Sequence, residues 1–217
     1  MSDARTRMVA RAAREIAPGM VVNLGIGLPT RVVNHLPADF PFCLHTENGL
    51  SGIGATLPPE RADRNLIDAG GAYVSTIPGS AFFDSAVSFA LVRSGRIDLT
   101  MLGAFEVSET GDLANWKIPG KFSPGAGGGI ELAQKARRVV VLTTHTDRDG
   151  NPKLLSECTL PLTASGCVSR IFTDLAVIDV TPSGFALREL AAGVSAGDVR
   201  HATGAALEIP SGEIPVF

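Results

Sequence analysis

The chain has 217 residues, of which 45% are hydrophobic, and a formal net charge of −3. A chain of this length is suited to one domain, and its apolar content is sufficient for a substantial core. The mild acidity and the lack of a basic stripe argue against a nucleic-acid partner. The sequence therefore predicts a single domain over residues 1–217.

The sequence also argues against a secreted or membrane protein. The first residues, MSDARTRMVARAAREI, carry charges throughout and lack the apolar stretch of a secretion signal. No stretch approaches the roughly 20 apolar residues that cross a bilayer. The three cysteines, Cys43, Cys158 and Cys167, have no CxxC spacing, which favours free, buried thiols in a reducing compartment. We therefore expect a cytoplasmic protein with no membrane contact.

Helix and strand patterns alternate along the first part of the chain. Residues 3–17 have the apolar spacing of a helix, which a Pro-Gly pair ends. An apolar strand at 20–24, a return helix at 30–36 and a second strand at 42–45 follow. Such a strand–helix–strand unit is typical of a parallel sheet covered by helices.

The same alternation continues toward the C-terminus. A strand at 72–77 precedes a helix at 84–95, which begins with Asp84 as its N-cap and ends at a glycine. Further strands are predicted at 98–107, 139–144 and 175–181, and short helices at 186–193 and 196–204. The predicted fold is α/β, an open and mostly parallel sheet with helices on both faces.

Glycines gather where the predicted strands end. There are 24 in the chain, more than the usual share of about 7% would give, and they cluster at 25–27, 49–54 and 125–129 among other places. Ligands of open α/β sheets bind beyond the carboxyl ends of the strands, where glycine lets backbone amides face them. The clustering predicts a site built largely from main chain.

Common cofactor and metal motifs are incomplete. The segment GIGLPT at 25–30 begins like a dinucleotide motif but has Thr30 in place of the third glycine. The pair Gly120–Lys121 lacks the upstream glycine of a P-loop, and no GxSxG nucleophile motif is present. The four histidines are far apart and have no metal-ligand spacing, so no metal site is predicted.

Two segments contain residues that are candidates for binding or catalysis. In GAGGGIEL at 125–132 a glycine loop leads into a predicted helix, which is typical either of a flexible surface loop or of an oxyanion hole or phosphate cradle. In GDLANWKIPGKF at 111–122, Asn115 is suited to orient a carboxylate or donate to an oxyanion, and Lys117 or Lys121 to contact a phosphate. Trp116 between them is more typical of a core residue.

Glu47 is the carboxylate that the pattern singles out. It follows a strand and precedes a glycine-rich turn in HTENGLSGIG at 45–54. One interpretation is a solvated turn residue. The other is a nucleophile toward activated acyl groups, which forms an anhydride and then a thioester.

Several long segments resemble one family. The chain is similar to the β subunits of bacterial 3-oxoacid CoA-transferases and to the C-terminal half of the mitochondrial succinyl-CoA:3-oxoacid CoA-transferase. The resemblance covers almost the whole length, in NLGIGLP (23–29), TENGLSGIG (46–54), LIDAGGAYVSTIPGSAFF (66–83), DLTMLGAFEVSETGDLANWKIPGK (98–121), CTLPLT (158–163) and CVSRIFTDLAVIDV (167–180). It implies the fold of the family I CoA-transferases.

The resemblance also implies roles for particular residues. Glu47 matches the family's catalytic glutamate, which carries CoA as a glutamyl thioester in a ping-pong reaction. The oxyanion and supporting roles fall on Asn48, Asn115, Gly127 and Gly128. The CoA-binding or substrate-binding roles fall on Gly25, Gly27, Lys121, Gly125 and Ala126.

The family further implies an assembly and a substrate class. An α subunit is expected to complete the active site in an α2β2 heterotetramer, with coenzyme A as a substrate and no other cofactor. The expected reaction moves CoA from an acyl-CoA such as succinyl-CoA to acetoacetate or 3-oxoadipate. The alternatives are a non-catalytic acyl-CoA sensor and an acyl-CoA hydrolase. The glycine loop departs from the family at Pro124, Ala126, Gly129 and Ile130, which bears on the choice of acid.

Overall fold

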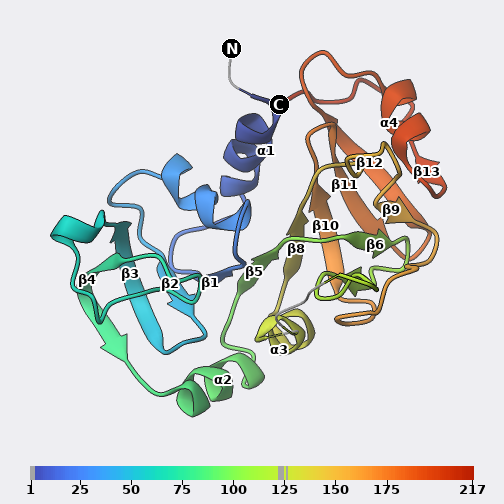
Figure 1. Cartoon of the computed structure of the whole chain (residues 1–217). Coiled ribbons are helices and arrows are strands. Elements are labelled where there is room, and N and C mark those ends of the chain that lie inside the picture. Colours follow the sequence, from blue (N-terminus) through green and yellow to red (C-terminus); the bar gives the residue numbers. More distant parts are fainter. Residues whose placement is uncertain (1–2, 122–124, 126) are drawn as a thin grey trace.

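A ten-stranded sheet runs through the molecule in the computed structural model, which describes residues 3–121, 125 and 127–217 (Figure 1). The strand order is β13-β12-β11-β10-β8-β5-β1-β2-β3-β4. Its members are β1 (Val21–Leu24), β2 (Cys43–Thr46), β3 (Leu50–Thr56), β4 (Val74–Phe82), β5 (Leu99–Leu102), β8 (Val139–Leu142), β10 (Val168–Phe172), β11 (Ala176–Thr181), β12 (Gly184–Leu190) and β13 (Leu207–Glu208).

The middle of this sheet is parallel. Strands β10, β8, β5, β1 and β2 run in one direction, so their carboxyl ends lie at one edge. Antiparallel pairs extend the sheet on both sides, through β3 and β4 beyond β2 and through β11 and β12 beyond β10. The mostly parallel sheet that the sequence predicts is confirmed.

A second, three-stranded sheet and the helices cover the large sheet. The small sheet has the order β7-β6-β9, with β6 (Glu106–Ser108), β7 (Leu113–Ala114) and β9 (Leu154–Leu155). The helices are α1 (Ala4–Ala13), α2 (Ser85–Arg93), α3 (Gly129–Lys135) and α4 (Ala196–Ala202), with short 3-10 helices η1 (Pro29–His35) and η2 (Pro59–Arg61). No helix in the described part of the chain is long and apolar enough to cross a membrane.

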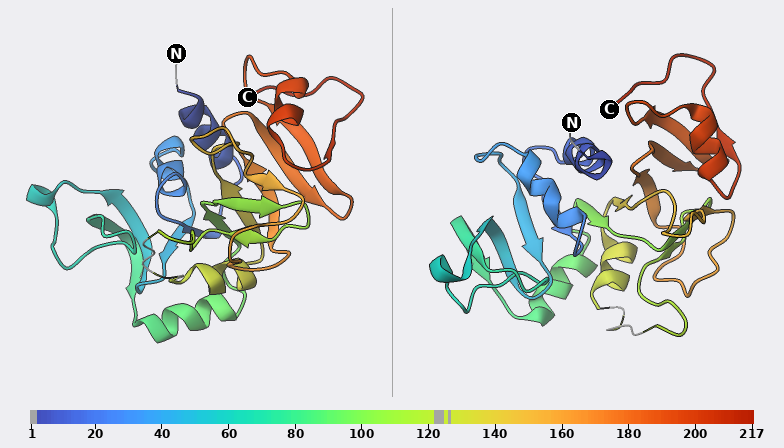
Figure 2. Two further views of the ribbon diagram at one scale, coloured as in Figure 1. Left: turned by 45° about the vertical axis from the view of Figure 1, so that its right-hand side comes forward. Right: turned by 45° about the horizontal axis from the view of Figure 1, so that its top comes forward.

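Two hydrophobic clusters occupy the two faces of the sheet. Successive side chains of a strand point to opposite faces, so alternate residues of β8 belong to different clusters. Val140 and Leu142 pack with α1 and η1 on one face. Val139 and Val141 pack with the small sheet, α3 and α4 on the other. Both views in Figure 2 keep α1 near the chain termini and α2 beside α3 at the other end of the molecule. Helices therefore cover both faces, as predicted.

Three predicted elements differ from the structure. The predicted helix at 186–193 is wrong, because this segment forms most of β12, where pairing with β11 and burial of Phe185 and Leu187 outweigh helix propensity. The predicted strand at 98–107 is two strands, β5 and β6, in different sheets. The predicted return helix at 30–36 is the 3-10 helix η1.

The three cysteines are free, as expected, although each is only half-buried. Burial raises the pKa of Cys158 to about 12 and that of Cys167 to about 11. Both thiols are therefore protonated and poorly nucleophilic at neutral pH.

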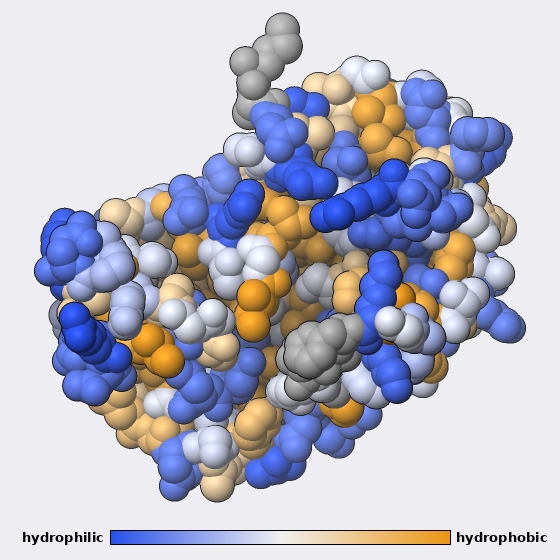
Figure 3. Space-filling model, in the orientation of Figure 1, coloured by the Kyte–Doolittle hydropathy of each residue, from blue (hydrophilic) through white to orange (hydrophobic). Residues whose placement is uncertain are grey.

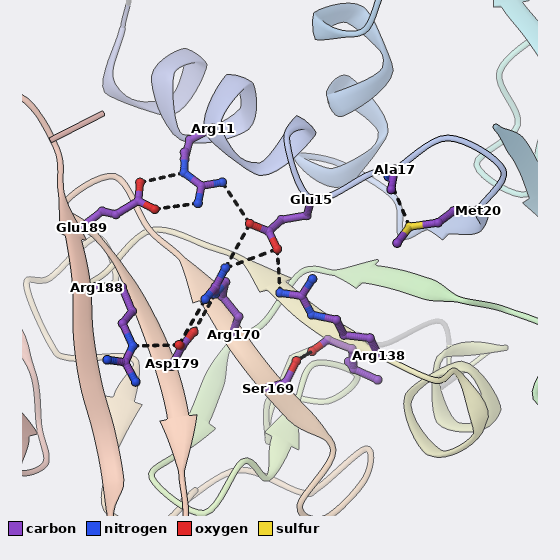
Figure 4. Close-up of polar contacts among 11 residues, drawn as sticks. Arg11, Glu15, Ala17, Met20, Arg138, Ser169, Arg170, Asp179, Arg188 and Glu189 are labelled. Carbon is purple, nitrogen blue, oxygen red and sulfur yellow. Dashed lines mark hydrogen bonds and ion pairs between the residues drawn. The ribbon is translucent and has the colours of Figure 1, made fainter. Parts of the chain in front are cut away.

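Glu15 is the centre of an ion-pair network that attaches α1 to the sheet (Figure 4). Its carboxylate is 3.0 Å from Arg11, 2.6 Å from Arg138 and 3.1 Å from Arg170, with only 8% of the side chain exposed. Burial alone would raise the pKa of Glu15, but hydrogen bonds from Arg138 and Arg11 outweigh it and lower that pKa. The ionised carboxylate is thus stabilised by the fold.

We expect Glu15→Gln to lower the free energy of unfolding at pH 7 by about 3 kcal/mol, because it leaves three half-buried arginines short of a carboxylate. The stabilisation is present above the unfolded pKa of Glu15 and is lost as the pH falls through the lowered folded pKa. Urea unfolding at pH 7 and in acid measures both effects, so the difference from the parent protein should shrink in acid. Glu213→Gln, at an exposed position, is the control. Equal losses in the two variants would contradict the assignment.

Candidate active site

A hairpin presents Glu47 at the carboxyl end of β2. The antiparallel pairs His45–Ser51 and Thr46–Leu50 leave Glu47, Asn48 and Gly49 as the connecting turn. Gly49 has φ +113°, and a Cβ atom there would lie 1.9 Å from the carbonyl oxygen of Phe83. Only glycine fits this position, so the turn depends on the glycine that follows the carboxylate.

Glu47 lies in a large cleft at the carboxyl ends of the parallel strands. The cleft has a volume of about 1080 Å³, and Figure 3 shows it as a hollow with apolar and weakly polar residues inside and hydrophilic residues around it. Its lining includes residues that follow β1, β5 and β8, at the edge where open α/β sheets bind ligands. The glycines in that lining are Gly25, Gly103, Gly125, Gly127, Gly128 and Gly129.

The Glu47 side chain is held between a strand and the glycine loop. Asn23 in β1 donates a hydrogen bond from Nδ2 to Oε2 of Glu47 at 3.3 Å and another to the carbonyl oxygen of His45 at 3.1 Å. From the other side Gly128 approaches so closely that a Cβ atom there would lie 3.2 Å from Cγ of Glu47 and 3.1 Å from the Phe89 ring. The carboxylate is half-buried, with one oxygen hydrogen-bonded by an amide.

His45 lies beneath the hairpin and is electrically neutral. It is 1% exposed, and its Nε2 atom is 3.0 Å from the hydroxyl of Ser88. Burial lowers the pKa of His45 to about 4. At neutral pH it therefore supplies no positive charge to Glu47, and its role here is to fix the strand that carries the turn.

Most of the predicted site residues line the same cleft. Besides Glu47 these are Gly25, Asn115, Lys121, Gly125, Gly127 and Gly128. The carboxamide of Asn115 is bound within the wall, since it donates to the carbonyl oxygen of Gly103 at 3.0 Å and accepts from Thr163 at 2.6 Å. Asn115 thus shapes the wall, and its hydrogen bonds are to the scaffold and not to Glu47.

Two predicted residues are not brought into the cleft. Asn48 is exposed, and its Nδ2 atom donates to the carbonyl oxygen of Ile67 at 2.8 Å, so its side chain braces the turn from outside. Gly27 is in the loop after β1, where its carbonyl oxygen accepts from Thr30 at 2.8 Å, but it is not among the residues lining the cleft. Ala126 and Pro124 lie outside the described residues.

Asn23 is the residue that the sequence reasoning missed. Its side chain is 1% exposed, and no group in the described part of the chain donates to its Oδ1 atom, although it lines the cleft. The sequence feature that could have identified it is a single asparagine inside the apolar strand VVNL, because a buried amide needs hydrogen-bond partners. Its register opposite His45 in β2 then places it beside residue 47.

Comparisons with known proteins identify a family for this chain. Residues 5–201 match the family model for coenzyme A transferase. The beta subunit of a probable coenzyme A transferase from Bacillus subtilis is 48% identical over 205 residues, which cover 94% of each chain. A subunit of a probable succinyl-CoA:3-ketoacid coenzyme A transferase from the same organism is 47% identical over 203 residues, again 94% of each chain.

A solved structure has the same fold. The acyl-CoA transferase YdiF from Escherichia coli O157:H7 superposes with a TM-score of 0.78 at 24% identity, over 100% of this chain and 43% of its own. The chain therefore spans less than half of that longer polypeptide. This chain belongs to the coenzyme A transferase family, in which it is a subunit of a CoA-transferase.

Proposed function

We propose that the chain is the Glu47-bearing subunit of an enzyme that moves CoA between an acyl-CoA and a 3-oxoacid. The observation that carries the proposal is the position of Glu47, at the end of a parallel strand, in a cleft of about 1080 Å³, between an asparagine amide and a glycine loop. A carboxylate held there faces a space large enough for a CoA thioester. The name of the Bacillus subtilis succinyl-CoA:3-ketoacid relative supports this substrate class.

The proposed chemistry uses Glu47 as a covalent nucleophile. A carboxylate oxygen attacks the thioester carbonyl, the carbon–sulfur bond breaks, and CoA leaves as a thiolate with a mixed anhydride remaining on the enzyme. The thiolate then attacks the glutamyl carbonyl and expels the first acid, which leaves a glutamyl-CoA thioester. The incoming acid reverses both steps, so the kinetics are ping-pong.

The glycine loop is the proposed oxyanion hole. Each tetrahedral intermediate places negative charge on one oxygen, and backbone amides near Gly127 and Gly128 are suited to bind it. The close approach of Gly128 to Glu47 supports this role, since no side chain separates the loop from the carboxylate. One such donor typically contributes about 3–4 kcal/mol to catalysis.

The assembly belongs to the same proposal. The relatives named above are subunits, which supports an α-subunit partner, and we propose an α2β2 heterotetramer in the cytoplasm. The partner would cover the half-exposed Glu47 and exclude water from its anhydride. Coenzyme A takes part as a substrate, and the proposed steps use no other cofactor.

Intact-mass spectrometry of the assembled enzyme tests the proposal. After incubation with acyl-CoA and no acceptor acid, this chain should gain the mass of one CoA less one water, on the peptide that contains Glu47. The Glu47→Ala variant in the same assembly should gain nothing. A mass gain in both proteins, or in neither, would contradict the mechanism. Steady release of free CoA without an acceptor acid would identify a hydrolase.

Asn23→Ala should slow the reaction without abolishing it. The variant loses the amide that holds Oε2 of Glu47, and a hydrogen bond to a charged group contributes about 1.5–3 kcal/mol. We expect kcat to fall about 10- to 100-fold. The loss should appear as slower formation of the CoA adduct in rapid-quench experiments. Asn115→Ala is the matched control, because that amide bonds to Gly103 and Thr163 in the wall. An equal fall in adduct formation in both variants would contradict a direct action on Glu47.

A further inference from the structure

The cleft has a second charged end, which the proposed chemistry at Glu47 does not use. Lys153 reaches it from the segment before β9, and the exposed cations Arg5 and Arg148 line the same part of the cleft. Burial lowers the pKa of Lys153, the charges of Asp147 and Asp174 oppose this shift, and the charge of Arg5 adds to it. Three cations from two distant segments, the N-terminal helix and the loop between β8 and β9, thus line one cleft.

Hydrogen bonds to the protein hold the ammonium group of Lys153 in place. Its side chain is half-buried, and Nζ donates to the hydroxyls of Thr144 at 2.9 Å and Thr143 at 3.1 Å, directly after β8. An ammonium group has three N–H donors, so these two hydroxyls leave one for a ligand. The neutral hydroxyls orient the ammonium group, whereas Asp147 and Asp174 act on it through their charges.

The two carboxylates in this part of the cleft are bound to the scaffold. Asp147 accepts hydrogen bonds from the backbone amides of Asp149 and Asn151 and from the Asn151 side chain. Asp174 accepts from the backbone amide of His145 at 2.8 Å. Neither forms an ion pair with Lys153 in the described part of the chain. With Arg5, Arg148 and Lys153 against these two carboxylates, the net charge of this end is positive and favours an anion.

The distance between the two ends of the cleft matches the separation between the thiol and the diphosphate of coenzyme A. Glu47 follows β2, whereas Thr143 and Thr144 follow β8, and the order β8-β5-β1-β2 separates them by three strand spacings, roughly 14 Å. The pantetheine arm of CoA is comparable to about four extended residues, or about 14 Å. Leu102, Phe105 and Leu142 line the cleft as well and suit an uncharged arm.

We propose that Lys153, assisted by Arg5 and Arg148, binds the diphosphate of coenzyme A at the β8 end of the cleft while the thioester reaches Glu47. This inference rests on the proposed function and adds to it the direction in which the substrate lies. It assigns to Lys153 the role of a binding residue remote from the reacting atoms. Binding energy at the diphosphate would place the thioester against the carboxylate.

The test compares Lys153→Met with the parent enzyme, both in the full assembly, on three thioesters of one acid: acyl-CoA, acyl-dephospho-CoA and acyl-pantetheine. Because a hydrogen bond to a charged group is lost, KM should rise about 10- to 100-fold for the first two substrates. For acyl-pantetheine, which has no diphosphate, kcat/KM should be the same in both enzymes. Lys153→Arg keeps the charge and should retain a KM within a few-fold of the parent enzyme.

Two further variants separate binding from folding. Arg148→Met changes an exposed residue and should raise the same two KM values to a smaller extent. Lys135→Met removes an equal charge from an exposed position outside the cleft lining and should change none of them. An equal loss on all three thioesters, or a loss that disappears with acyl-dephospho-CoA, would overturn the diphosphate assignment. A parent enzyme that forms no adduct with any thioester would instead refute the proposed function.

Discussion

Glu47→Gln is expected to reduce CoA transfer by more than about 10⁴-fold, because the amide keeps the shape of the side chain but lacks the nucleophilic oxygen. The hydrogen-bond donor at Asn23 and the contact with Gly128 remain available to the new side chain, so binding of acyl-CoA should change little. The measurement is the transfer rate under saturating substrates together with the Kd for acyl-CoA.

Glu47→Asp is the companion variant. It keeps the charge but withdraws the carboxylate by one methylene group, and a displacement of about 1 Å can cost about 10²-fold in rate. We expect an activity between those of the parent enzyme and Glu47→Gln, with a detectable CoA adduct. If Glu47→Gln retains the parent's rate, the nucleophile lies elsewhere and the role proposed for the cleft fails.

Gly49→Ala is expected to lower the free energy of unfolding by about 3–5 kcal/mol and to remove activity. Two costs add: a positive φ in a residue with a Cβ atom, and a Cβ position 1.9 Å from the carbonyl oxygen of Phe83. The backbone amide of Phe83 also donates to the carbonyl oxygen of Gly49 at 2.9 Å, so relief of the clash disturbs a hydrogen bond.

Gly79→Ala is the control for Gly49→Ala. Gly79 has φ +89° in the neighbouring strand β4, but nothing lies within 4 Å of the place that a Cβ atom would take there. Its cost should be limited to backbone strain, about 1–2 kcal/mol. Denaturant unfolding of both variants, together with the transfer assay, distinguishes the cost of backbone strain from that of the steric clash with Phe83. Similar losses of stability in the two variants would show that the Phe83 contact is unimportant.

The sequence predicted the framework of the site because that framework depends on local patterns. Apolar strands followed by glycines placed the ligand cleft at the carboxyl edge of the sheet, and Glu47 at the end of one strand. The helix that begins after Asp84 was predictable for a similar reason, since the Asp84 side chain accepts from the amide of Val87 at 2.8 Å. Such caps involve residues three apart in sequence.

What could not be predicted depends on contacts between distant segments. Asn23 reaches Glu47 through the parallel register of β1 and β2, which no spacing within VVNL encodes. Asn48 was expected in the site because it adjoins Glu47, yet its side chain bonds to Ile67 outside the cleft. The segment 186–193 is rich in helix-forming residues, but its pairing with β11 and β13 and the burial of Leu187 make most of it a strand. The orientation of Lys153 likewise depends on its hydrogen bonds to Thr143 and Thr144, which lie nine or ten residues earlier in the chain.

The hairpin between β2 and β3 has a consequence for how this enzyme can be altered. The side chain proposed as the nucleophile belongs to a three-residue connection and contributes to neither of the hydrophobic clusters on the two sheet faces. The proposed reactive residue and the two hydrophobic clusters are thus encoded at separate positions, so a redesign at position 47 has to retain the backbone geometry of residue 49 and fit between Asn23 and Gly128. The scaffold would tolerate new chemistry there at little thermodynamic penalty.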